Sequence, residues 1–78
     1  MSQRSGTRHV HAPLYKSFLS RLRDARLKAG LTQAEVAKHL GKPQSYVAKS
    51  ESGERRVDVV ELHGFAKLYR RPLDFFVA

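Results

Sequence analysis

The chain has 78 residues and a formal net charge of +8 at pH 7, from fifteen Lys and Arg against seven Asp and Glu. This length allows one small domain without room for a buried catalytic apparatus and a substrate cavity, and the strong basic excess is typical of nucleic-acid binders. The absence of cysteine excludes disulfides and Cys-based zinc sites, and no apolar run approaches the roughly 20 residues of a membrane span.

Residues 1–13 are predicted to form a flexible basic tail, because they are rich in Ser, Arg and His and lack apolar periodicity. Pro13 also disfavours helical geometry at the residue before it. The tail is either a disordered leader or a basic arm that reaches the backbone or minor groove of DNA. His9 and His11 form a pair with no third ligand nearby, so we expect no metal site.

A first helix is predicted over residues 14–29, because apolar side chains recur there on one helical face. These side chains are Phe18, Leu22, Ala25 and Ala29, with Leu19 and Leu27 widening the face. Gly30 follows at the C-cap, where a left-handed backbone commonly ends a helix.

Two short helices are predicted within residues 30–53. Thr32 and Glu35 have the spacing of a capping box, which marks the start of the first. Pro43 separates the helices, since proline disfavours helix at the preceding residue and suits the start of a new one. The second helix then begins at Gln44 and is short, polar and basic. Two helices joined by a short glycine-containing turn form a helix-turn-helix unit, whose second helix enters the DNA major groove.

A fourth helix is predicted to begin near Asp58, because Asp58 and Glu61 repeat the capping spacing. Pro72 is placed as the first residue of a short last helix. No β-strand alternation occurs in the sequence. We therefore predict an all-α fold, a compact bundle of about five short helices over residues 14–78, preceded by the tail.

These residues resemble the lambda-repressor-like Cro/xenobiotic-response-element family of helix-turn-helix proteins. The resemblance covers residues 19–76 and rests on a set of motifs that is specific only as a whole. The motifs are Leu22-Arg23, Arg26, Gly30-Leu31-Thr32-Gln33, Glu35-Val36-Ala37, Leu40-Gly41, Gln44-Ser45, Val47, Glu51, Gly53 and Arg55-Arg56. It implies a bundle of about five helices that binds operator DNA, usually as a dimer.

Three residues of the predicted second helix of the unit are expected to read bases. Gln44, at its first position, can bond adenine N6 and N7 through its amide. Ser45 can bond several bases and so discriminates weakly. Lys49 lies one turn beyond Ser45 on the same face and can reach guanine O6 and N7 or a phosphate.

Four further residues are expected to contact phosphates. Gln33 begins the preceding helix, where its amide and free backbone N–H groups can bind a phosphate, and the resemblance implies the same role. Tyr46, Arg55 and Arg56 are better placed for phosphates than for bases.

The resemblance also implies a partly buried ion pair between Arg26 and Glu51 that ties the first helix to the DNA-reading helix. Ser50 departs from the family pattern, in which a large aliphatic residue is usual. A buried hydroxyl needs a hydrogen-bond partner, and we expect the Ser50 hydroxyl to bond a carbonyl one turn back, near Tyr46.

The last helix is expected to form a homodimer interface through Phe75 and Phe76. Adjacent helical residues point about 100° apart, so one ring should face outward. Because one short helix buries little area, the free protein is expected to dimerise only weakly, with DNA driving the pairing. The dimer would place two reading helices about 34–36 Å apart. The alternative is that this ring packs under the first helix or the N-terminal segment.

The sequence favours a cytoplasmic, nucleoid-associated transcriptional regulator, specifically a repressor, whose partner is double-stranded operator DNA. One alternative is an antitoxin that also binds a cognate toxin, and another is a protein-bridging module without an operator. No cofactor is expected. An enzyme is the least favoured class, because P-loop, Gly-x-Ser-x-Gly and His-Glu-x-x-His motifs are absent.

Overall fold

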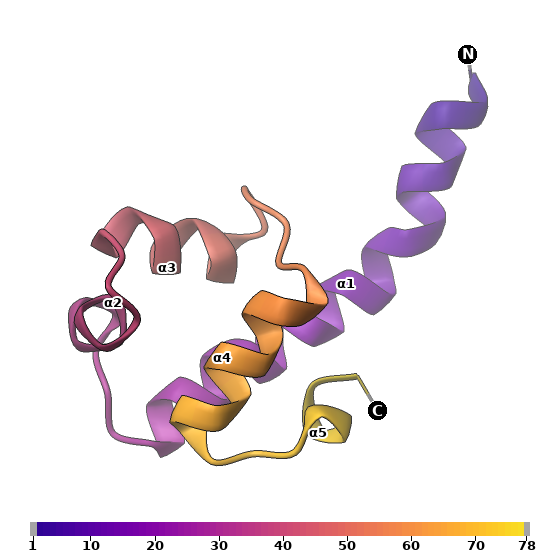
Figure 1. Ribbon diagram of the computed structural model, residues 1–78. Helices are drawn as coiled ribbons and strands as arrows, with labels where there is room; N and C mark the ends of the chain where they lie inside the picture. Colours follow the sequence, from indigo (N-terminus) through magenta and orange to yellow (C-terminus); the bar gives the residue numbers. More distant parts are fainter. Residues whose placement is uncertain (1, 78) are drawn as a thin grey trace.

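The computed structural model describes the backbone of residues 2–77 and the side chains of residues 13–77. Five α-helices make up the fold, and no strand occurs within the described backbone (Figure 1). They are α1 (Ser2–Lys28), α2 (Gln33–Leu40), α3 (Gln44–Ser52), α4 (Val59–Tyr69) and α5 (Leu73–Val77). The all-α prediction is confirmed. No described helix is both long enough and apolar enough to cross a membrane.

The start of α1 differs from the prediction, which placed it at Leu14. The helix begins at Ser2 and contains Pro13, and its N-terminal turns project away from the other helices (Figure 1). A proline inside a helix removes one hydrogen bond and costs about 3 kcal/mol, but it does not forbid the conformation. Pro13 itself is exposed, so its ring does not disturb the packed core. The bundle itself is built from the later part of α1 and the four shorter helices.

Both predicted capping boxes are present. The Thr32 hydroxyl accepts from the Glu35 amide at 3.1 Å, and the Glu35 carboxylate accepts from the Thr32 amide at 2.8 Å. Asp58 and Glu61 exchange the equivalent bonds at 2.8 and 3.0 Å. Each box satisfies two backbone donors that the first turn of a helix leaves free. These contacts fix where α2 and α4 begin.

Apolar side chains from all five helices meet in one core. Its largest fully buried members, with relative exposures below 2%, are Phe65, Phe76, Leu22, Val36 and Val47. Phe65 of α4 contacts Tyr69, one turn later, at a ring-centroid distance of 5.9 Å. This core therefore holds the five helices together, and α2 and α3 pack on it through Val36, Ala37 and Val47.

Helices α2, α3 and α4 each end at a residue with left-handed backbone, namely Gly41, Gly53 and Arg70. Gly53 ends α3 with φ of 88°, and a Cβ built there would lie 2.9 Å from Leu19 Cδ1. Both conformation and space thus favour glycine. Arg70 ends α4 with φ of 59°, although it is not glycine. Pro72 precedes α5 rather than beginning it, and its carbonyl accepts from the Phe75 amide at 3.0 Å.

Candidate nucleic-acid interface

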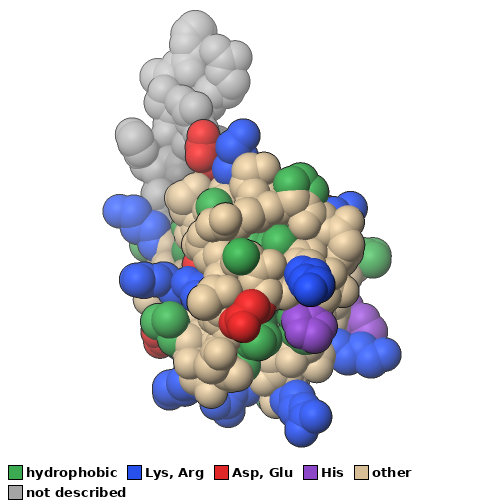
Figure 2. Space-filling model, turned by 90° about the vertical axis from the view of Figure 1, so that its left-hand side faces the viewer, with side chains coloured by type: hydrophobic (Ala, Val, Ile, Leu, Met, Phe, Trp, Pro, Cys, Tyr) green, Lys and Arg blue, Asp and Glu red, His purple; other side chains and the backbone are tan. Residues whose placement is uncertain are grey.

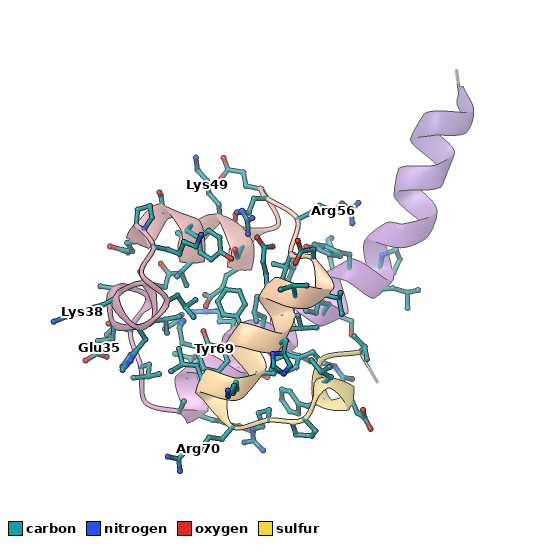
Figure 3. All side chains as sticks on the ribbon, viewed as in Figure 1. Glu35, Lys38, Lys49, Arg56, Tyr69 and Arg70 are labelled. Carbon is teal, nitrogen blue, oxygen red and sulfur yellow. The ribbon has the colours of Figure 1, made fainter. Side chains whose placement is uncertain are left out.

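Helix α3 has one solvent-facing side and one core-facing side. Gln44, Ser45 and Lys49 are exposed, whereas Val47 and Ser50 are completely buried. Lys49 extends outward from α3 in Figure 3. The three residues predicted to read bases therefore lie on accessible surface of the same helix. Their side chains carry amide, hydroxyl and ammonium groups, which can bond base edges or phosphates.

A chain of hydrogen bonds runs from this exposed side into the bundle. Gln44 Nε2 donates to Gln33 Oε1 at 3.4 Å, and Gln33 Nε2 donates to Glu51 Oε1 at 3.0 Å. Glu51 in turn accepts from Arg26 of α1. Because a glutamine amide has two N–H donors, Gln33 keeps one for another acceptor. The network restricts the orientation of the Gln44 amide before any ligand arrives.

Arg26 and Glu51 form a bidentate ion pair between α1 and α3. Arg26 Nε lies 2.6 Å from Glu51 Oε2, and Nη2 lies 3.1 Å from Oε1. The side chains are only 9% and 5% exposed, and Arg26 Nη1 also donates to the Leu31 carbonyl at 3.0 Å. The hydrogen bond to Glu51 raises the pKa of Arg26. The guanidinium thus joins α1, the turn before α2 and the C-terminal half of α3.

The buried Ser50 hydroxyl has the partner that the sequence predicted. Ser50 Oγ donates to the Tyr46 carbonyl at 2.7 Å, one helical turn back. It also accepts from Arg55 Nη1 at 3.2 Å. A fully buried hydroxyl without such bonds would be destabilising. Here the two bonds satisfy the hydroxyl and join α3 to Arg55 in the segment that follows it.

Tyr46 and Arg55 belong to a second polar cluster, between α3 and α4. The Tyr46 ring stacks on Phe65 at a centroid distance of 6.2 Å, and the Arg55 guanidinium lies 4.3 Å from its centroid. Arg55 Nη2 donates to Glu61 Oε2 at 2.6 Å. This bond raises the pKa of Arg55 and lowers that of Glu61, while burial raises the pKa of Tyr46. Both Nη atoms of Arg55 therefore already donate hydrogen bonds within the protein.

Arg56 and Lys42 are freer cations beside this cluster. Arg56 is exposed, lies 4.8 Å over the Tyr15 ring and forms no ion pair within residues 13–77. Figure 3 shows it on the segment after α3, toward α1. Lys42 Nζ lies 5.2 Å from the Tyr46 ring centroid. The sequence analysis missed Lys42, because a lone lysine in a turn carries no motif.

Sequence reasoning also missed the structural partners of this surface. Glu61 was expected only as a helix cap, but it also binds Arg55. The Tyr15 hydroxyl accepts from the Val57 amide at 3.1 Å and supports the segment between α3 and α4. Contacts between residues 42 positions apart have no local sequence signal. The surface around α2 carries many Lys and Arg side chains and few Asp and Glu (Figure 2).

The two phenylalanines of α5 occupy different environments. Phe76 is 1% exposed and belongs to the core, so it offers no surface to a second copy. Phe75 is half-buried, packs edge-on against Phe76 at 5.1 Å and carries the Arg71 guanidinium 5.1 Å from its centroid. The predicted use of Phe76 as an interface residue is corrected, because its ring already fills the protomer's own core.

The arrangement is that of a helix-turn-helix DNA-binding domain, and comparisons with known proteins agree. Residues 17–74 match the family described as helix-turn-helix domain. A solved structure described as an XRE-family like protein from Pseudomonas syringae pv. tomato str. DC3000 is similar, with 40% sequence identity and a TM-score of 0.81. The alignment covers 88% of this chain and 84% of that chain. A comparison with curated proteins gave no match.

The chain belongs to the helix-turn-helix family and is of the Cro/XRE type. It is a DNA-binding domain of the transcriptional-regulator class, a class that is typically not enzymatic. Helices α2 and α3 are the two helices that the sequence predicted for the motif, and both lie within the matched residues.

Proposed function

We propose that the protein is a transcriptional repressor that binds an operator through the exposed side of α3. The observation that carries this proposal is the accessible row of Gln44, Ser45 and Lys49 on a helix whose opposite side is anchored in the core. A rigidly held helix with free polar groups suits the major groove, where each base pair presents a distinct pattern of donors and acceptors.

In this proposal some residues bond to bases and others contact phosphates. Gln44 bonds adenine in the orientation that Gln33 gives it, while Lys49 bonds guanine or a neighbouring phosphate and Ser45 adds a weakly selective bond. The remaining N–H of Gln33 and the Arg56 guanidinium contact phosphates. Tyr46 and Arg55 contribute to phosphate binding mainly at their exposed edges, since their other contacts lie within the protein.

We further propose that two copies bind a pseudo-palindromic operator through the outer side of α5. Phe75 retains exposed surface there, and Leu73 is 38% exposed. A two-fold pair would set the reading helices about 34–36 Å apart, one turn of B-DNA. One short helix buries little area, so pairing would be driven largely by DNA.

Selection of bound sequences from random DNA, followed by affinity measurements over a range of salt, tests the repressor proposal. Log K should fall linearly with log salt, by about 0.9 for each phosphate neutralised. Lys49→Ala should cost about 1–3 kcal/mol on the selected site and relax the preference at one position.

Lys67→Ala is the matched control for Lys49→Ala. It removes the same charge from an exposed position on α4, and it should leave the preference for the selected site unchanged. Equal affinity of the parent for selected and random DNA at every salt concentration would refute sequence-specific binding.

A further inference from the structure

An open apolar groove of about 610 Å³ lies between α1, the start of α4 and α5. Its apolar lining comes from all three helices, and we call it the α1–α4–α5 groove. The apolar lining residues include the buried Leu62 and Phe76 as well as Leu14, Phe18, Val59 and Val77. This volume is in the range of small-molecule sites, which are typically lined by apolar side chains with a few polar groups.

The rim of the groove exposes more apolar surface than the protein's own fold requires. Leu14 is 75% exposed, and Val59 and Val77 are each 69% exposed. Three large apolar side chains from three helices thus gather around one concavity of a strongly charged domain. Contiguous exposed apolar surface of this kind commonly marks a binding site.

The charged groups at the groove distinguish one kind of occupant. Arg56 lines it and forms no ion pair among residues 13–77, while its guanidinium lies 4.8 Å over the Tyr15 ring, which also lines the groove. The acidic lining residue, Asp58, already accepts from the Glu61 amide at 2.8 Å. Among residues 13–77, the groove therefore presents apolar walls with Arg56 as its available cation, the complement of an apolar molecule with a single anionic group.

We propose that the α1–α4–α5 groove binds a free carboxylic acid with an aliphatic body, whose carboxylate pairs with Arg56. The aliphatic chain of the acid lies against the apolar wall. Its carboxylate meets the Arg56 guanidinium in the segment between α3 and α4. Because Arg56 is also a proposed phosphate contact, the ligand competes with DNA for this side chain. This consequence rests on the proposed function, whereas binding of the acid itself does not.

Calorimetric titration of the full chain with octanoate, decanoate and decanol, all below their aggregation limits, tests the binding step. Decanoate should bind about 15-fold more tightly than octanoate, since two further methylenes are buried at about fourfold each. Decanol, which has the same chain without the charge, should bind more weakly than decanoate. Arg56→Gln should reduce decanoate binding to the level of decanol.

A matched pair of variants separates the groove from general attraction of anions to a basic protein. Val59→Asp places a carboxylate in the groove and should abolish decanoate binding. Val60→Asp changes the net charge equally at the next residue of α4, which is 76% exposed but does not line the groove, and it should bind decanoate like the parent. Neither valine is buried, and unchanged melting temperatures would verify the folds.

Equal binding of decanoate by the parent and Val59→Asp, or no binding by either, would overturn the proposal. Two other outcomes would also overturn it. The first is that Val59→Asp only dissociates a dimer, which would assign the groove to a second copy. The second is that Val59→Asp only weakens binding to anionic phosphatidylglycerol vesicles, which would assign it to a membrane surface.

The competition is tested separately on the selected operator. Decanoate should lower the parent's DNA affinity by about the same factor as DNA lowers its decanoate affinity, because coupling between two binding sites is reciprocal. Arg56→Gln should remove this coupling. If decanoate binds in the groove but DNA affinity does not change, the ligand site stands and Arg56 is not shared. If no operator is found, the proposed function fails and the binding step is unaffected.

Discussion

Helices α3 and α4 are neighbours of similar length that are held in the bundle by different kinds of contact. Four residues of α4 are buried in the core, namely Leu62, Phe65, Ala66 and Tyr69. Only Val47 and Ser50 of α3 are buried. Beyond the stacking of Tyr46 on Phe65, α3 is held by polar contacts, namely the Arg26–Glu51 ion pair, the Gln33 amide and the bonds of the Ser50 hydroxyl.

The difference follows from what each kind of contact can do. Apolar burial contributes most of the stability, but it is non-directional. Hydrogen bonds and bidentate ion pairs add little net stability and fix geometry, because they require particular distances and angles. A helix that leaves one side free, as the proposed contact of α3 with DNA requires, cannot bury many apolar groups. Helix α4 therefore contributes most of the apolar burial, and we propose that the polar contacts of α3 set the angle at which its exposed side is presented to DNA.

The largest effect is expected from removing one member of the ion pair. Glu51→Ala leaves the Arg26 guanidinium buried without its carboxylate and the Gln33 amide without its acceptor. The free energy of unfolding should fall by about 3 kcal/mol, as measured by urea denaturation. Glu54→Ala removes an exposed carboxylate and should change it by less than about 0.5 kcal/mol. Equal stability of the two variants would mean that the polar anchorage of α3 is dispensable.

A smaller change in the free energy of unfolding, an increase, is expected from a substitution in α4. The Tyr69 hydroxyl is buried without a hydrogen-bond partner within residues 13–77, and burial raises its pKa well above the ordinary value of 10.0. Tyr69→Phe removes this polar atom and should stabilise the domain by about 1 kcal/mol. Tyr15→Phe, which loses the bond to the Val57 amide, should destabilise it by a similar amount. Thermal unfolding distinguishes the two signs.

The smallest effect on stability is expected at the ion pair between Arg55, in the segment that follows α3, and Glu61 of α4. The Arg55 guanidinium, and then the Asp58 amide, lower the pKa of Glu61 below its ordinary value of 4.5. A lowered pKa stabilises the fold above the ordinary value, and this contribution is lost as the pH falls through the folded-state value. Glu61→Gln should therefore lose less stability than the parent between pH 6 and pH 3. Glu54→Gln, at an exposed position, should behave like the parent, and a matching loss in both variants would contradict the account.

Local contacts were the part of this structure that the sequence predicted best. Capping boxes depend on residues three apart, so Thr32–Glu35 and Asp58–Glu61 could be read directly from the sequence. The bond from Ser50 to the Tyr46 carbonyl has the same local character. The ion pair between α1 and α3 joins residues 25 positions apart. It was predicted only from the resemblance to a family, because no local pattern indicates it.

The misjudged features depend on three-dimensional context. Pro13 was taken as a boundary, but an exposed helix that projects from the bundle can accommodate it. The sequence indicated that one of the two rings, Phe75 or Phe76, should be less buried. Which ring is buried depends on how α5 meets the core, and the sequence does not show this. The second contact of Glu61, with Arg55, depends on the path of the segment before α4. Such long-range geometry leaves no periodic signal.

The most direct test of the central claim compares stability and specificity in one variant. Replacing Arg26 and Glu51 together by leucine removes the directional contact and supplies apolar groups, so the loss of stability should be much smaller than for either single change. The account predicts that this folded variant loses at least tenfold in its ratio of affinities for selected and random DNA, about 1.4 kcal/mol. A folded double variant with the parent's affinity ratio would show that polar contacts do not set the reading angle of α3.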